Sequence, residues 1–226
     1  DVIKHAGVQS VSLISAPIAA ALGAGQILDL PDTILSVVIG KNLTDCGIYC
    51  CGGTIYEKSL AFGGYSIDLG ICRFLQKKYH LMVVPEQAEQ LKHEWASCIS
   101  GGEQKIFTVR GRRLEDGVEI IIELTDYELA SVMQENLMPV VKLIKDVLHY
   151  STPEMAEDLI HNGMLLSGGS AQLPEIPQWI SSQIGIPVFI PKEPETVVAI
   201  GCYQAIDNGK DLSLLINRGD KYYGGF

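Results

Sequence analysis

The chain has 226 residues, a formal net charge of −10, six cysteines and 47% hydrophobic residues. This length and apolar content suffice for a buried core, so we expect a folded chain. The acidic balance, without a cluster of Lys and Arg, argues against nucleic acid or an anionic membrane surface as a partner. No apolar run reaches the roughly 20 residues that span a bilayer, and the cysteines show neither a CxxC pair nor a spaced histidine. We expect a soluble protein of a reducing cytoplasm, without a metal site.

The first quarter of the chain predicts mainly strands. A helix end at 1–6, a strand at 10–14 and a short helix at 18–22 come first. Val, Ile, Thr and Tyr then cluster at 34–40, 44–50 and 55–60, which is typical of strands. Gly52-Gly53 predicts a tight turn, because glycine accepts positive φ at both central positions. The other turn, Lys41-Asn42-Leu43, reads from its own residues as an ordinary solvated turn.

The rest of the chain alternates helices and strands. Helices are predicted at 66–79 and from Pro85, and a hairpin is predicted around Glu115-Asp116-Gly117. Thr125 and Glu128 have capping-box spacing at the start of a long amphipathic helix. The last third predicts a strand at 164–167, a helix at 175–184, a strand at 188–190 and a helix at 195–205. The fold class is therefore α/β.

Two short motifs could bind a ligand. Gly168, Gly169 and Ser170 lie between a buried strand and a helix, where backbone N–H groups can converge on an anionic or polar group. The plain alternative is that such turns need glycine for steric reasons. Glu89 and Lys92 share a helix face, and a surface ion pair is the alternative for them. Asp68 is expected to be a first-turn helix acid favoured by the helix dipole.

Six segments carry a resemblance to a known family: "HAGVQSVSLISAPIAAALGAG", "GGTIYEKSLAFGGYSID", "AEQLKHE", "VRGRRLEDG", "TPEMAEDLIHNGMLLSGGSAQLP" and "IGIPVFIPKEPETVVAIGCYQAI". Read together, they resemble the MreB-type bacterial actin homologues and, more distantly, actin and the seventy-kilodalton heat-shock proteins. The resemblance covers nearly the whole chain, in family order and at family spacing.

The resemblance implies an actin-like ATPase fold with a ribonuclease H-like core, of which this chain is the second half. Residues 1–52 and 127–226 would form the core subdomain, and residues 53–126 would form a smaller inserted α/β subdomain. The helix at 195–206 would pack on the first half, which is absent. The family's first phosphate loop would be absent with it.

The resemblance also implies that the turn at 41–43 is the family's second phosphate loop. Gly40 is kept, but Lys41, Asn42 and Leu43 take the positions of two glycines and a threonine. Side chains there crowd the space of phosphate oxygens. Lys41 can still offer one positive charge to a phosphate. Val38 stands in place of an acid that would hold the water shell of a metal.

The residues that would activate water are replaced as well. The family carries two glutamates before Pro17, one of which positions the attacking water. Ser15 and Ala16 replace them here. Loss of a general base typically lowers the rate about 100-fold or more. We therefore expect no catalytic residue in this chain.

The residues that would contact the nucleoside match the family better than those that would contact the phosphates. Glu89, Lys92 and Glu94 match the helix that contacts ribose and base, and residues 168–171 match the adenosine loop. The expected cofactor is ATP or ADP with Mg²⁺. The expected nucleotide-binding residues are Gly40, Lys41, Asn42, Glu89, Lys92, Glu94, Gly168, Gly169, Ser170 and Ala171.

The resemblance predicts a cytoplasmic MreB-type cytoskeletal protein in cell-shape determination. It would self-associate into filaments or oligomers, contact other cell-shape proteins, and retain an adenine-nucleotide site with eroded ATP hydrolysis. Membrane association through the absent half or through partners stays open. Two alternatives are an active ATP-hydrolysing member of the superfamily and a nucleotide-free protein interaction module.

Overall fold

The computed structural model describes residues 12–28, 31–99, 104–207 and 216–218. Its largest sheet is an antiparallel meander extended by two parallel strands. Neighbouring antiparallel strands need only short turns, whereas the parallel strands follow long helical crossovers. In spatial order the strands are β4 (Gly53–Leu60), β3 (Thr44–Cys50), β2 (Ile34–Ile39), β8 (Met164–Ser167) and β9 (Val188–Phe189).

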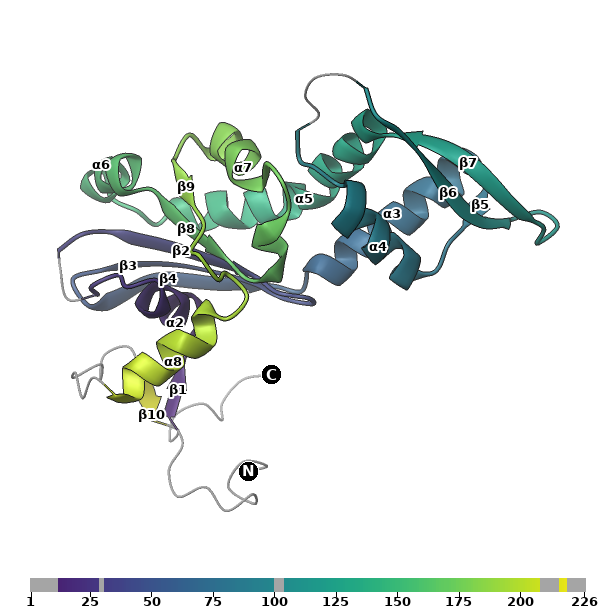
Figure 1. Ribbon diagram of the computed structural model, residues 1–226. Helices are drawn as coiled ribbons and strands as arrows, with labels where there is room; N and C mark the ends of the chain where they lie inside the picture. Colours follow the sequence, from purple (N-terminus) through teal and green to yellow (C-terminus); the bar gives the residue numbers. More distant parts are fainter. Residues whose placement is uncertain (1–11, 29–30, 100–103, 208–215, 219–226) are drawn as a thin grey trace, which may run out of the picture.

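Helices cover both faces of this sheet (Figure 1). One face carries α5 (Asp126–Leu148), α6 (Pro153–Asn162) and α7 (Ile176–Ile184), and the other carries α2 (Ala16–Gly23) and α8 (Val197–Asp207). All six residues of β2 are buried because this central strand is covered on both sides. Leu35, Val37 and Ile39 join the larger core, whereas Ile34 and Val38 join the smaller core beside α2.

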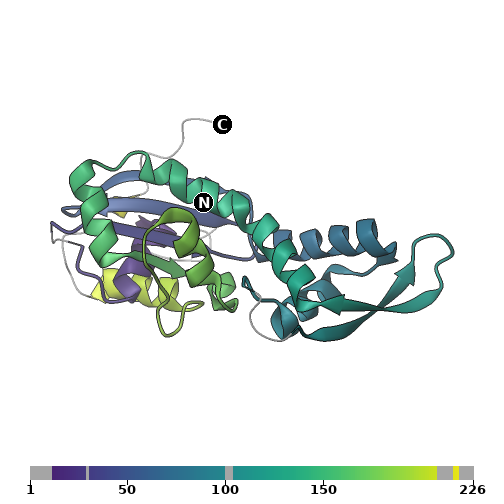
Figure 2. The same ribbon diagram turned by 90° about the horizontal axis from the view of Figure 1, so that it is seen from above.

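A second lobe extends from one end of the molecule (Figure 2). Its three-stranded sheet has the order β5 (Leu81–Met82), β6 (Ile106–Arg113) and β7 (Glu119–Thr125), and it is packed with α3 (Gly64–Tyr79) and α4 (Pro85–Trp95). Helix α5 contacts both lobes. Strand β4 pairs with β3 in the large sheet, and the division at residues 53 and 126 stays a prediction. No helix in the described ranges combines the length and hydropathy that crossing a bilayer requires.

Most of the predicted elements are confirmed, with changes at their ends. The strands at 44–50 and 164–167 and the hairpin around residues 115–117 are present, as is the capping box at the start of α5. Strand β5 and helix α6 were not predicted. The predicted helix end at 1–6 lies outside the described residues, and β1 (Ser12–Ile14), paired with β10 (Ile216–Arg218), takes up the last part of the predicted strand at 10–14.

The predicted Gly52-Gly53 turn is wrong by one residue. Gly53 pairs with Cys50, so Cys51 and Gly52 are the two central residues, with φ of 52° and 70°. Cys51 is a non-glycine residue in the left-handed region, where side chains are seldom found. A register shift follows between Ile48 and Tyr49. The hairpin sequence alone therefore does not give the pairing along β4.

Helices α2 and α8 approach closely through two glycines. A Cβ on Gly201 would lie 1.7 Å from the carbonyl oxygen of Ala19, and a Cβ on Gly23 would lie 2.0 Å from that of Val197. Only glycine allows two backbones this close. Val197 is accordingly 2% exposed against α2. One face of α8 is thus covered within this chain.

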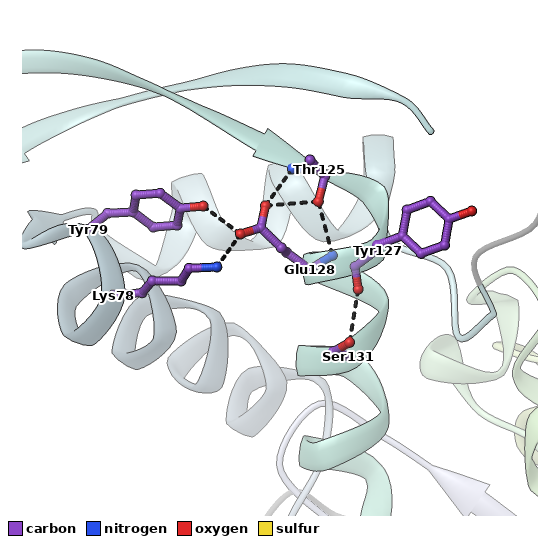
Figure 3. Close-up of polar contacts among 6 residues, drawn as sticks. All are labelled: Lys78, Tyr79, Thr125, Tyr127, Glu128 and Ser131. Atoms are coloured by element: carbon purple, nitrogen blue, oxygen red, sulfur yellow. Dashed lines mark hydrogen bonds and ion pairs between the residues drawn. The ribbon is translucent and has the colours of Figure 1, made fainter. Parts of the chain in front are cut away.

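Glu128 ties the start of α5 to the end of α3 (Figure 3). Its carboxylate accepts hydrogen bonds from Thr125 N at 2.9 Å, Thr125 Oγ1 at 2.8 Å and Tyr79 Oη at 2.6 Å, and it forms an ion pair with Lys78. Burial acts to raise the pKa of Glu128, but these donors outweigh it and lower the pKa to about 2. The folded state therefore favours the ionised carboxylate.

We expect Glu128 to make stability depend on pH in the acid range. Its folded pKa lies below the unfolded value of about 4.3, so its contribution is present above the unfolded pKa and is lost as pH falls through the folded pKa. Urea unfolding of Glu128→Gln should show a destabilisation at neutral pH that shrinks towards pH 2. Glu123→Gln, at an exposed site without an ion pair among the described residues, is the control. A destabilisation independent of pH would contradict this role of the charge.

Candidate functional site

A cavity of about 240 Å³ lies where residues from distant parts of the chain meet. The turn after β2, the start of α3, helix α4, the 3₁₀ helix η1 (Gly169–Gln172) and the segment before α8 all contribute. The site therefore lies between the two lobes, at the carboxyl ends of β2 and β8, where α/β sheets commonly bind ligands. Its lining residues are Gly40, Lys41, Gly64, Glu89, Lys92, His93, Gly169, Ser170, Gln172, Leu173, Pro174 and Glu195.

The turn after β2 is held against the first turn of α3. Gly64 N donates to Gly40 O at 2.9 Å and Tyr65 N donates to Lys41 O at 2.8 Å. Gly63 permits this contact, since a Cβ there would lie 2.5 Å from Gly40 O. These two N–H groups of α3 are thus already bonded. The side chain of Lys41 is exposed and forms no ion pair with any described residue.

Lys92 is buried and paired with Asp68. Lys92 Nζ lies 2.6 Å from Asp68 Oδ1 and donates to Gly64 O at 3.2 Å. Burial raises the pKa of the Asp68 carboxyl, and the Lys92 ammonium opposes that rise. The alternative of a surface pair with Glu89 is therefore wrong for Lys92. The expectation that Asp68 is a first-turn acid is also wrong, because Asp68 lies in the second turn of α3. The ion pair joins α3 to α4 beside the cavity.

The loop after β8 forms another wall of the cavity. Gly169 is exposed, and a Cβ built on it would meet no atom within 4 Å. Its neighbour Gly168 has φ of 87° and ψ of 165°, and a Cβ there would lie 2.3 Å from the carbonyl oxygen of Ile39. Gly168 is therefore required by the backbone, whereas Gly169 is not. The two adjacent glycines therefore differ, because the backbone requires glycine at position 168, whereas position 169 has room for a side chain.

The structure brings together six of the ten predicted nucleotide-binding residues. Gly40, Lys41, Glu89, Lys92, Gly169 and Ser170 line the cavity, whereas Asn42, Glu94, Gly168 and Ala171 do not. Ala171 is fully buried, and Asn42 and Glu94 are exposed. Helical spacing could have indicated His93 beside Glu89, because residues four apart share a face. Nothing local in the sequence points to Gln172, whose amide donates to Glu195 at 2.8 Å across the chain.

A carboxylate missed by sequence reasoning lies beside Ser15. Ser15 Oγ donates to Glu57 Oε1 at 2.5 Å, and Tyr49 Oη donates to the same oxygen. Glu57 faces Gly47 across the β3–β4 pair. Val38 is 8% exposed within the apolar core beside α2. Within the described ranges, no three His, Cys, Asp or Glu side chains gather as a set of metal ligands.

The architecture is that of the actin-like ATPases. The structure matches MreB5 of Spiroplasma citri bound to ADP with a TM-score of 0.85 at 24% identity, covering 92% of this chain and 65% of that one. It matches a chain of the MamK double helical filament with a TM-score of 0.68 at 15% identity, covering 85% and 58%. These matches identify the class by its fold.

Sequence comparison narrows the class to one family. A family model described as MreB/Mbl protein matches residues 1–214. The cell shape-determining protein MreB of Escherichia coli (strain K12) is 33% identical over 213 residues, covering 92% of this chain and 61% of that protein. Mbl of Bacillus subtilis (strain 168) is 27% identical over 208 residues, covering 92% and 62%. The chain belongs to the MreB/Mbl family, and it spans about three fifths of the length of these relatives.

Proposed function

We propose that the chain is part of a cytoplasmic MreB-type cytoskeletal protein that determines cell shape, binds an adenine nucleotide and has eroded ATP hydrolysis. One observation carries the nucleotide proposal: Lys41, Glu89 and Ser170, far apart in sequence, line one cavity. The ADP and AMPPNP named for MreB5 support the choice of ligand. We also propose that residues 53–126 act as an inserted subdomain on a core of residues 1–52 and 127–226.

The cavity suits the nucleoside end of a nucleotide. Its volume of about 240 Å³ is below the roughly 300–1,000 Å³ of pockets for drug-sized ligands. The carboxylate of Glu89 can accept hydrogen bonds from ribose hydroxyls. Because the charge of Lys92 is compensated by Asp68, Lys41 is the lysine in the lining that remains available for a phosphate. Mg²⁺ would bind together with the phosphates of the nucleotide.

Gly169 offers a test of this site. We expect Gly169→Val to lower ADP affinity by tenfold or more, because the new side chain would occupy the cavity wall. Its melting temperature should stay within about 3 °C of wild type, since the position is exposed and open. Titration calorimetry with ADP and Mg²⁺ and a thermal melt provide the two measurements.

Gly168→Ala is the matched control. Its backbone angles lie in a region that is essentially reserved for glycine, and a Cβ would meet the backbone of β2. That variant should lose about 1–3 kcal/mol or more of stability. Wild-type ADP affinity in Gly169→Val would contradict the proposed site, and equal loss of folding in both variants would return the loop to a purely steric role.

Eroded hydrolysis is proposed from the residues that replace the family's acids. Val38 is buried in an apolar core and Ser15 donates a hydrogen bond to Glu57, so neither offers a base to a water molecule. The proposal is tested by steady-state phosphate release from ATP, which should not exceed the buffer rate. If hydrolysis is eroded, Ser15→Glu with Val38→Asp should raise the rate, provided the rest of the protein is present. No gain in a double variant that keeps the wild-type thermal stability would assign the loss to the side chains at 41–43.

Glu57 favours the alternative of an active ATPase. Its carboxylate lies at the Ser15 hydroxyl, where the resemblance places a family glutamate, and it could substitute for that group in orienting water. Phosphate release that is lost in Glu57→Gln would establish this alternative and exclude the eroded site. Release at the buffer rate in wild type and variant would leave Glu57 as a hydrogen-bond partner of Ser15 and Tyr49.

Self-association is proposed through the outer face of α8. Ile200, Tyr203 and Ile206 are 37%, 65% and 83% exposed, and their spacing puts them on one side of the helix. Full burial of an exposed apolar side chain contributes about 1.5–3 kcal/mol, and these side chains would gain the part of it that corresponds to their exposed surface. The MamK filament supports assembly as a property of the fold class.

We expect concentration-dependent association in sedimentation velocity that Tyr203→Lys with Ile206→Lys reduces. Val197 is unsuitable as a probe, because it is buried against α2 and its replacement would disturb folding. Leu13→Lys, at another exposed apolar side chain, provides the control. A monomer at all concentrations, or association that the double variant leaves unchanged, would contradict the role of this face.

A further inference from the structure

A second cavity, of about 670 Å³, lies between α3 and α5 and shares no residue with the first. We call it the α3–α5 groove. Its volume is within the roughly 300–1,000 Å³ typical of ligand pockets. Each helix contributes one stripe of residues spaced by three and four, which therefore lie on one face. Besides Phe62, the groove is lined by Ser66, Leu69, Gly70, Arg73, Phe74 and Lys77 of α3 and by Val132, Glu135, Asn136 and Pro139 of α5.

Part of the groove wall is apolar. Phe62, Leu69 and Phe74 contribute carbon surface, and Leu69 is 37% exposed. A Cβ on Gly70 would lie 2.0 Å from Asn136 Oδ1, so the glycine leaves room for the Asn136 side chain between the two helices. An apolar side chain entering from a ligand would therefore be enclosed by helix surfaces on two sides.

Two cations at the groove have no partner of their own. Arg73 and Lys77 are exposed, and neither forms an ion pair with any residue in the described part of the chain. They are one helical turn apart on α3, where like charges repel. Glu135 is the acid in the lining. In a chain with net charge −10, this local excess of positive charge favours an anionic group beside the apolar surface.

Pro139 adds a hydrogen-bond acceptor. It lies inside α5 and has no N–H, so the carbonyl of Glu135 lacks the donor that a helix normally provides four residues later. Both residues line the groove. A ligand that brings an N–H group can satisfy this carbonyl.

We infer that the α3–α5 groove binds a segment of a partner protein that carries an aromatic or branched apolar side chain next to a carboxylate. The apolar side chain fills the groove, the carboxylate meets Arg73 and Lys77, and a backbone N–H bonds to the Glu135 carbonyl. An anionic bilayer fits less well, because the site is recessed between helices and the net charge of the chain repels such a surface.

The test is an NMR titration of the ¹⁵N-labelled chain with the peptide acetyl-Asp-Leu-Phe-Asp-amide up to millimolar concentration. Amide shifts should cluster at residues 66–77 and 132–138. Arg73→Glu with Lys77→Glu should weaken binding by about tenfold or more. Arg112→Glu with Lys145→Glu makes the same change of charge at exposed sites outside the groove and should leave binding unchanged. Acetyl-Asn-Leu-Phe-Asn-amide should bind more weakly than the acidic peptide.

Several outcomes would overturn the inference. The absence of shifts at millimolar peptide, shifts that map to the cavity at Lys41, or equal binding of the neutral peptide would each do so. A sedimentation assay with vesicles of phosphatidylcholine and phosphatidylglycerol tests whether the groove region binds lipid instead. If they sediment the wild-type chain but not the Arg73→Glu, Lys77→Glu variant, the groove region is a lipid site instead.

Discussion

Asp68→Leu is expected to destabilise the chain by about 3–5 kcal/mol, the usual cost of leaving one member of a buried ion pair without its partner. Asp68 and Lys92 are 1% and 5% exposed, so water cannot replace the lost carboxylate. Such a loss is a large part of the 5–15 kcal/mol that stabilises a typical domain. Urea unfolding followed by circular dichroism measures it, and Lys92→Met should cost a similar amount.

The double variant distinguishes an ion-pair effect from a packing effect. Replacing a buried pair by apolar side chains of similar volume is often neutral or stabilising. Asp68→Leu with Lys92→Met should therefore be more stable than either single variant. Additive losses would contradict this account and would indicate that each side chain packs independently. Unchanged ADP affinity in the double variant would also show that the charge of Lys92 is not used by the ligand.

Gly201→Val is expected to be the most disruptive single substitution in α8, with a loss of about 3 kcal/mol or more. A Cβ at this position would lie 1.7 Å from the backbone oxygen of Ala19. A backbone atom cannot rotate away as a side chain can, so α2 and α8 would have to separate. Their separation would expose Val197 and the smaller core that it closes. Thermal and urea unfolding report this loss.

Ala199→Val is the control, because Ala199 is exposed on the same helix. Intrinsic helix propensity ranks the two substitutions in the opposite order, since valine is a better helix former than glycine and a poorer one than alanine. Propensity alone therefore predicts Ala199→Val as the worse variant by about 1 kcal/mol, the difference in propensity between alanine and glycine. A Gly201→Val variant as stable as wild type would show that α2 and α8 are not in contact as described.

The candidate site shows which features local sequence patterns can predict and which they cannot. Gly169 and Ser170 could be placed at a strand-to-helix turn because strands and turns have local composition. Their position opposite Glu89 depends on how α4 packs across the lobes, which no local pattern states. The alternative of a surface pair between Glu89 and Lys92 was wrong for this reason. Burial of α3 against α4 gives Lys92 a different partner in Asp68.

The β3–β4 hairpin shows a second limit. A turn with Gly52-Gly53 at its centre and regular pairing would not place Glu57 opposite Gly47. The actual turn at Cys51-Gly52 and the register shift at Ile48 and Tyr49 do so. Because side chains alternate between the faces of a strand, one residue of slip moves every later side chain to the other face. The position of the Glu57 carboxylate beside Ser15 could therefore not be predicted before the register was known.

By itself, the sequence determined the α/β order, most strands and helices, the capping box of α5 and the resemblance to the MreB-type proteins. These features depend on residues that are close along the chain or on the order of whole segments. The tertiary structure alone decided that Lys92 pairs with Asp68, that Glu57 meets Ser15, and that Gly23 and Gly201 join α2 to α8. Each of these contacts joins separate elements, and each depends on strand register or on the distance between helix backbones, neither of which local composition encodes.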